Sequence, residues 1–137
     1  MSTGKGRKAE LRRLAAKHGV ALALLIWFPG AHGATTSFVC NFSVSTSPSG
    51  LEKETPALEM RFVLDSKTNK TYLMGNNGSS EVHAILNSDG ISFLEITESG
   101  NAMVTTISAS GAAVHSRNSI FGPDLIPSQH YGSCVRL

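Results

Sequence analysis

The sequence has few of the features that usually indicate an enzymatic or binding activity. Of its 137 residues 16% are charged, and residues 34–137 contain no tryptophan, which weakens a carbohydrate-stacking function. The three histidines of this part do not form the H-x-H, H-E-x-x-H or Cys/His patterns of zinc sites. No serine lies in a G-x-S-x-G motif, the turn that exposes a hydrolase nucleophile. We therefore expect no metal, no cofactor and no catalysis.

An excess of positive charge is also missing from the larger part of the chain. The net charge of +2 combines two unlike segments. Residues 1–33 carry six basic residues and one acidic residue, a net +5, whereas residues 34–137 carry six basic and nine acidic residues, a net −3. Clustered basic residues bind phosphate backbones, so this acidic part is not expected to bind nucleic acid.

Residues 1–33 have the order of a secretory signal peptide. A basic stretch that ends at Lys17 precedes the apolar run Val20–Phe28, a Pro-Gly pair and a small-residue site that ends at Gly33. The run is far shorter than the roughly 20 residues with which a helix crosses a membrane. We expect cleavage after Gly33, a periplasmic or secreted location and no stable membrane anchor afterwards; a retained leader is the alternative.

Only two cysteines are present, Cys40 and Cys134, and both lie in residues 34–137. Exported chains enter compartments that oxidise thiols, so we expect a disulfide between them. The pair lacks the close C-x-x-C spacing of redox-active cysteines, which favours a structural role. Because the loop that it closes is nearly the whole domain, the bond is expected to add about 4–5 kcal/mol of stability.

Hydrophobicity alternates with a period of two residues after residue 34, which predicts an all-β chain with a single domain over 34–137. The alternation is clearest in Leu58–Asp65, where every second residue from Leu58 is apolar. Short turns separate the segments, as in a sequential antiparallel meander. Seven strands are expected: Ser37–Ser45, Leu58–Asp65, Lys70–Met74, Ser80–Leu86, Ile91–Thr97, Ala102–Ala109 and Ala112–Ser119.

A small meander barrel of about seven strands is favoured, because closure removes the exposed edges of a sheet. A two-sheet β-sandwich is the alternative. The polar segment Thr46–Pro56 is expected to be a surface loop, and Ile120–Ser133 is expected to be irregular. Six aromatic residues are expected to share one core: Phe38, Phe42, Phe62, Tyr72, Phe93 and Phe121.

Four residues are candidates for a binding site. His115 and Arg117 are two positions apart on one expected strand and therefore project from the same face. If that face points outward, they form a small cationic spot that can hold an anionic group. His130 and Tyr131 lie in a polar and aromatic segment near the second cysteine, a composition that interface loops use. The alternative is ordinary polar residues on solvated faces.

The segment Thr105–Arg117, followed by Tyr131-Gly132-Ser133-Cys134, resembles the C-terminal part of a group of small exported proteobacterial proteins. These proteins have a signal peptide, a β-rich chain, an early cysteine and a terminal Gly-x-Cys. The group is functionally uncharacterised, so the resemblance implies an exported β-rich fold and no catalytic residue. Ser110-Gly111-Ala112 is also distantly similar to a Ser-Gly loop of the periplasmic inhibitors of C-type lysozyme, which are disulfide-closed barrels.

Three functions are compatible with these patterns. The leading one is a non-catalytic binding or inhibitor-like module that contacts an envelope protein through its surface loops. The second is a carrier that holds a small ligand inside the barrel, and the third is a hydrolase whose site would pair Glu95 with a histidine. The carrier predicts a cavity among five inward residues: Met60, Phe62, Phe93, Met103 and Ile107. A surface-binding module predicts that this interior is filled.

Overall fold

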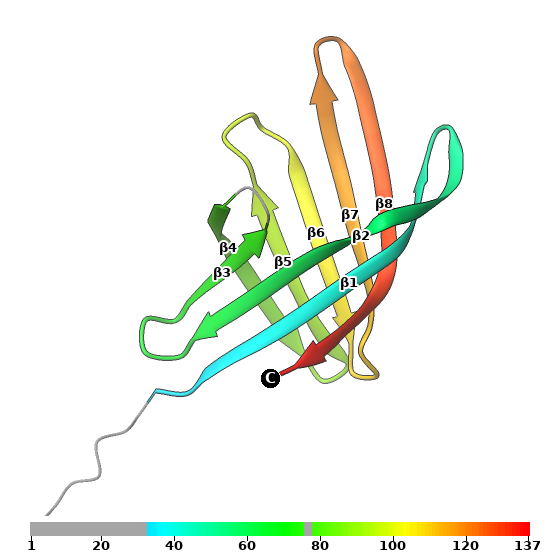
Figure 1. Cartoon of the computed structure of the whole chain (residues 1–137). Coiled ribbons are helices and arrows are strands. Elements are labelled where there is room, and N and C mark those ends of the chain that lie inside the picture. The colour runs from blue at the N-terminus through cyan, green and yellow to red at the C-terminus, as the bar shows by residue number, and fades with distance from the viewer. Residues whose placement is uncertain (1–32, 76–77) are drawn as a thin grey trace, which may run out of the picture. The chain divides into compact units, whose positions relative to one another are not determined.

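Eight antiparallel strands close into a barrel in the computed structural model, which describes residues 33–75 and 78–137 (Figure 1). The leader expected over residues 1–33 lies outside the described residues except for Gly33. No helix in the described part of the chain is long and apolar enough to cross a membrane. The strands are β1 (Thr35–Ser47), β2 (Gly50–Asp65), β3 (Lys70–Gly75), β4 (Gly78–Asn87), β5 (Gly90–Ile96), β6 (Ala102–Ser108), β7 (Ala112–Phe121) and β8 (Asp124–Arg136).

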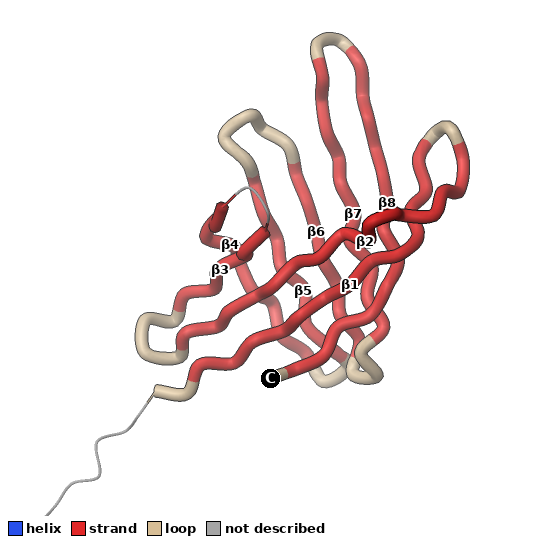
Figure 2. Tube along the Cα trace, viewed as in Figure 1, coloured by secondary structure: helices blue, strands red, loops and turns tan. Residues whose placement is uncertain are grey.

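Each strand pairs with the next one along the chain, and β1 pairs with β8 to close the barrel. This arrangement confirms the all-β meander barrel and gives no support to the sandwich alternative. The turns β1–β2, β5–β6 and β7–β8 and the paired ends of β3 and β4 lie at one end, which we call the hairpin end (Figures 1 and 2). The other three turns and the carboxyl terminus lie at the opposite end, which we call the terminal end.

The eighth strand corrects the expectation that Ile120–Ser133 is irregular. This segment forms the end of β7 and most of β8, with a turn in which Gly122 has a φ of 60°. Pro127 lies opposite Asn118 of β7, two residues beyond the last β1–β8 pair at Gln129. At that position β8 has a neighbour on one side only, so the N–H that proline lacks costs no bond to β1.

The expectation of a surface loop at Thr46–Pro56 is also wrong. Strands β1 and β2 continue through this segment as a hairpin, in which Ser47 pairs with Gly50. Gly50 has a φ of 123°, a conformation that favours glycine at a tight turn. The polar composition of the segment therefore belongs to a solvated hairpin that extends β1 and β2 at the hairpin end (Figure 1).

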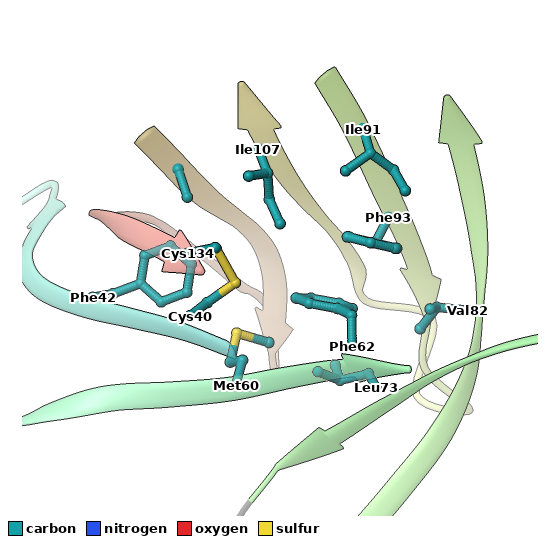
Figure 3. Close-up of a cluster of buried hydrophobic side chains, with 11 residues drawn as sticks. Cys40, Phe42, Met60, Phe62, Leu73, Val82, Ile91, Phe93, Ile107 and Cys134 are labelled. Atoms are coloured by element: carbon teal, nitrogen blue, oxygen red, sulfur yellow. A yellow bond between two sulfur atoms is a disulfide. The ribbon is translucent and has the colours of Figure 1, made fainter. Parts of the chain in front are cut away.

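Phenylalanine side chains fill the middle of the barrel (Figure 3). Phe62 of β2 and Phe93 of β5 are each 1% exposed, and their rings stack with centroids 4.0 Å apart. Phe42 is fully buried, as expected. Phe121 does not join this core, because it lies at the β7–β8 turn with 77% of its surface exposed. Tyr72 is half-buried and lies opposite Val63, on the outer face of β2.

Cys40 and Cys134 form the expected disulfide, which joins β1 to β8 at two directly opposite positions. The two residues are separated by 94 positions in sequence, and both are buried in the core. The bond therefore fastens the strand pair that closes the barrel. It is compatible with an oxidising extracellular or periplasmic location.

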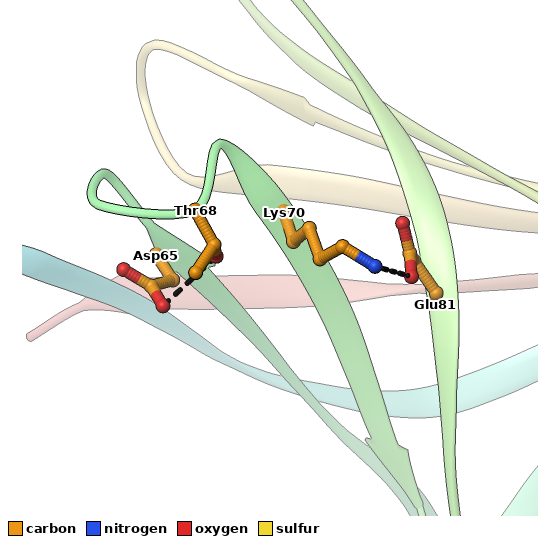
Figure 4. A network of polar contacts seen from close by, with 4 residues as sticks. All are labelled: Asp65, Thr68, Lys70 and Glu81. Carbon is orange, nitrogen blue, oxygen red and sulfur yellow. Dashed lines mark hydrogen bonds and ion pairs between the residues drawn. The ribbon is translucent and has the colours of Figure 1, made fainter.

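Local polar contacts fix the β2–β3 hairpin on the outside of the barrel (Figure 4). The carboxylate of Asp65 accepts hydrogen bonds from the backbone N–H of Lys67 and from the Thr68 hydroxyl, each at 2.9 Å. The Lys67 N–H, followed by the Thr68 hydroxyl, holds the pKa of Asp65 below its ordinary value. Lys70 donates to Glu81 of β4 at 2.7 Å. The Asp65 contacts therefore stabilise the β2–β3 turn, and the Lys70–Glu81 contact links β3 to β4 on the outer surface.

Candidate binding cavity at the hairpin end

The barrel is hollow at its hairpin end. A cavity of about 430 Å³ opens there, within the size range of small-molecule sites. Its apolar wall comes from four side chains on β2, β3 and β6: Leu58, Met60, Leu73 and Met103. Polar residues also line the cavity, among them Ser80, Glu95, His115 and Arg117, and Glu59, Ser79 and two glycines complete the lining. The cavity thus combines an apolar body with a few converging polar groups.

The strand register places the charged residues of this cavity. Glu95 lies opposite Met103 on β6, and Met103 lies opposite Arg117 on β7. Glu95 shares the inward face of Phe93 because the two residues are two positions apart on β5. The Ser80 hydroxyl donates to Glu95 Oε1 at 2.6 Å, which orients the carboxylate.

His115 is a buried histidine on β7, with 3% of its surface exposed. Its Nδ1 shares a hydrogen bond of 2.8 Å with the hydroxyl of Thr105, and its ring lies 6.0 Å from that of Phe42. Burial, followed by the nearby positive charges of His130 and Arg117, lowers the pKa of His115 from 6.5 to about 4. The ring is therefore neutral at neutral pH.

His130 of β8 lies beside His115, with ring centroids 5.7 Å apart. Its Nδ1 lies 3.1 Å from Glu54 Oε1, without hydrogen-bond alignment, and its Nε2 lies 3.3 Å from the hydroxyl oxygen of Ser128. Burial lowers the pKa of His130 and outweighs the opposite effect of the Glu54 charge. The His130 ring is therefore also neutral at neutral pH.

Arg117 carries the unused hydrogen-bonding capacity of the site. Its guanidinium forms no ion pair with any residue in the ranges 33–75 and 78–137, and its Nε is buried without a hydrogen-bond partner. A buried donor that lacks an acceptor costs about 1–3 kcal/mol. The buried Nε is out of reach of a ligand, but Arg117 also lines the cavity and brings there a positive charge that no carboxylate of the described residues pairs with.

Three of the four sequence-predicted binding residues meet inside the barrel. His115 and Arg117 share one face, as expected, but this face points into the barrel and forms no external cationic spot. His130 is buried next to them. Tyr131 points outward and donates to Gln129 Oε1 at 2.7 Å, so it does not take part in the cavity.

Two residues of the site were missed by sequence reasoning, Ser80 and Glu54. Ser80 is two positions from the buried Val82, so strand alternation already places it on the inner face. Glu54 lies in the segment whose polar composition predicts a loop, and no local signal links it to His130. In the described ranges, no group of three His, Cys, Asp or Glu residues is placed to hold a metal ion.

A second hollow of about 500 Å³ lies at the terminal end. Phe38, Leu64, Ile91 and Ile107 contribute to its wall, and Arg136 is the one charged residue among those that line it. The register places Phe62 and Phe93 between the two hollows, because each is flanked along its strand by residues that line one hollow or the other. The interior is therefore packed in the middle and open at both ends.

No family description, curated protein or solved structure matches this chain. The resemblance to small exported proteobacterial proteins therefore stays a prediction. A barrel fold alone does not assign a function, since similar barrels serve many purposes. The function has to be argued from the geometry of the cavity.

Proposed function

We propose that this protein binds a small molecule in the cavity at the hairpin end of the barrel. The observation that carries the proposal is the cavity itself, in which Arg117, without an ion-pair partner among the described residues, stands beside an apolar wall. Small-molecule sites are concave and mostly apolar, with a few placed polar groups. The fitting ligand has an apolar body and a hydrogen-bond acceptor that reaches Arg117. Of the five residues among which the carrier function predicts a cavity, Met60 and Met103 line this one, whereas Phe62 and Phe93 stack on each other and fill the middle of the barrel.

We also propose that binding takes place outside the cytoplasm, in the periplasm or after secretion. The signal-peptide pattern of residues 1–33 and the disulfide support this location. Native mass spectrometry of the full-length chain, recovered after export, tests it. The expected mass is that of residues 34–137 less two hydrogens. An uncleaved leader or free thiols would contradict the proposal.

Filling the cavity tests ligand binding. Gly75 lines the cavity, and a Cβ added there meets no atom of the described residues within 4 Å. Its φ lies outside the left-handed range, so Gly75→Phe introduces bulk into the cavity without backbone strain. Met74→Phe is the matched control, because Met74 is exposed on the outer face of the same strand.

Octanoate is a suitable probe because it joins an apolar chain to a carboxylate acceptor. Titration calorimetry is expected to show that Gly75→Phe weakens octanoate binding at least tenfold and that Met74→Phe leaves it unchanged. Equal affinities in the two variants, or no binding to the parent protein at millimolar octanoate, would contradict binding of this ligand class in the cavity. Extra mass that stays on the native protein after export would identify a different ligand directly.

The tip of the β7–β8 hairpin favours a second function, contact with an envelope protein. Ile120, Phe121 and Leu125 are 56%, 77% and 74% exposed and lie next to one another in the strand register. Exposed apolar clusters of this kind mark interaction sites. Asp124 is the one charged residue in Ser119–Ile126, so the tip offers no basic group for an anionic lipid surface, and a protein is the better partner.

Site-specific photo-crosslinking from the Phe121 position in exporting cells tests this second function. Ile85 is the control position, because it is 60% exposed on the outer surface of β4. A discrete protein adduct from position 121 that is absent from position 85 supports the contact. Adducts of equal yield from both positions, or Phe121-dependent sedimentation with anionic vesicles, would contradict it.

A further inference from the structure

Ser128, His130 and Glu54 form a continuous chain of contacts at the hairpin end. Ser128 and His130 are two positions apart on β8, so both side chains point into the barrel. The Ser128 hydroxyl oxygen lies 3.3 Å from His130 Nε2, and Glu54 Oε1 lies 3.1 Å from His130 Nδ1, close enough to act by its charge although the two atoms are not aligned for a hydrogen bond. A hydroxyl beside one imidazole nitrogen and a carboxylate beside the other is the arrangement that activates a serine nucleophile.

Ser128 is half-buried and lines a groove of about 270 Å³ beside β7 and β8. Thr46, Asn118 and Gln129 contribute polar groups to this groove. Arg117 lines both the groove and the larger cavity, so its side chain lies where the two hollows approach each other. A molecule bound at Ser128 can therefore place one part in the polar groove and another in the apolar cavity.

Arg117 also supplies the positive charge that acyl transfer needs. It lies directly opposite Ser128 in the β7–β8 register, and both residues are on the inner face. Arg117 lines both hollows, and its guanidinium forms no ion pair in the described part of the chain. Attack on a carbonyl carbon puts negative charge on the carbonyl oxygen, and a preorganised donor beside the nucleophile lowers that barrier.

His130 is in the protonation state that a general base requires. The charged and titratable groups that face it are Glu54 on β2 and His115 and Arg117 on β7. Burial is the largest of the effects on its pKa and lowers it, so the imidazole is neutral at neutral pH. Glu54 then stabilises the imidazolium that forms when Nε2 takes a proton.

We propose that Ser128 is the nucleophile of a hydrolytic site, with His130 as the base, Glu54 as its positioning residue and Arg117 as the oxyanion donor. The substrate class is a carboxylic ester whose acyl chain enters the apolar cavity. This activity rests on the proposed cavity binding and goes beyond it, and it departs from the sequence-based expectation of no catalysis. Ser128 lies within a strand and not at a strand-to-helix turn, so the G-x-S-x-G motif of such turns is absent around it.

The reaction balances with water as the second substrate. The Ser128 oxygen bonds to the carbonyl carbon while its proton moves to His130 Nε2. The bond from that carbon to the alcohol oxygen breaks, and the alcohol leaves with the proton from Nε2. Water then gives a proton to Nε2 and adds to the acyl-serine; the acid is released and the hydroxyl recovers its proton.

The test uses the full-length chain, exported and recovered with its disulfide intact, and two probes: a fluorophosphonate and p-nitrophenyl octanoate. The fluorophosphonate is expected to label Ser128, as located by peptide mass spectrometry. Ser128→Ala and His130→Gln are expected to abolish labelling at this position and to lower ester hydrolysis at least about 100-fold. Ser133→Ala, an exposed serine on the same strand, is expected to keep both.

Glu54 is tested by partial rescue. Glu54→Gln is expected to slow labelling of Ser128, and Glu54→Asp is expected to restore part of the rate, which a purely structural role would not do. Absence of Ser128 labelling in the native protein, or equal labelling in His130→Gln, would overturn the proposal. Octanoate binding without ester hydrolysis would reject the hydrolytic site and leave the proposed binding function standing. If the protein neither binds octanoate nor hydrolyses the ester, both proposals are rejected.

Discussion

Acid is expected to destabilise this protein through His115. The ring is 3% exposed, and burial is the main reason that its pKa falls from 6.5 to about 4 in the folded state. Between these two values the unfolded chain is protonated at this histidine and the folded chain is not, so stability falls as the pH falls. The difference of about 2.5 in pKa corresponds to about 3 kcal/mol of stability. This stability is fully present above pH 6.5 and is lost by the time the pH has fallen to about 4.

Urea unfolding at about pH 7 and about pH 4 measures this loss. The informative variant is the double substitution His115→Phe/Thr105→Val, which removes the titrating ring together with the hydroxyl that shares its hydrogen bond. It is expected to lose about 3 kcal/mol less than the parent over this pH interval. The contribution of Asp65 is present in both proteins and cancels in the comparison, whereas that of His130 is coupled to His115 and is followed separately by NMR titration of the His130 ring.

His83→Gln is the matched control, because His83 is exposed on β4. Its stability is expected to follow the parent at both pH values. The reasoning is refuted if the double variant loses as much stability as the parent, or if the His115 ring titrates near 6.5 in an NMR experiment on the folded protein.

Three further predictions concern stability. Replacing Cys40 and Cys134 together by alanine is expected to cost about 4–5 kcal/mol in urea unfolding, because the bond closes a loop over 94 positions; a loss under about 1 kcal/mol would contradict its role as a clamp. Phe62→Ala is expected to cost about 3–5 kcal/mol, since the ring is buried and stacked on Phe93, and a loss under about 1 kcal/mol would mean that the stack is not the core. Phe121→Ser is expected to change stability by less than about 0.5 kcal/mol, since the side chain is 77% exposed, and a larger loss would place it in a folding contact.

The fold was largely predictable because period-two alternation is a local property. The pattern over Leu58–Asp65 gave the correct inner face of β2, and the pairing of the only two cysteines followed from export. The eighth strand is not predicted from the sequence, because the prolines in Ile120–Ser133 indicate an interrupted strand. Pro127 is tolerated there because β8 has a single neighbour at that point, and only the tertiary arrangement reveals this.

The candidate site was predictable in its residues but not in its orientation. On β7 the hydropathy pattern favours Val114 as the inward residue, whereas the structure turns Ala113 and His115 inward and leaves Val114 on the other face. A shift of one residue in strand register exchanges the two faces, and an alanine beside a histidine is a weak signal against a valine. The contacts of His130 with Glu54 depend on closure of the barrel, which no local pattern encodes.

The division of the interior explains why stability and function rest on different residues. The Phe62–Phe93 stack and the disulfide hold the middle of the barrel through apolar burial. At the hairpin end the chain instead buries the Nε of Arg117 without a partner, which costs folding free energy at any pH, and holds His115 at a depressed pKa, which costs folding free energy in acid. Apolar side chains at these positions would fill the cavity and stabilise the barrel. Sequences depart from local consistency mainly at functional sites, and this end of the barrel is where the present chain does so.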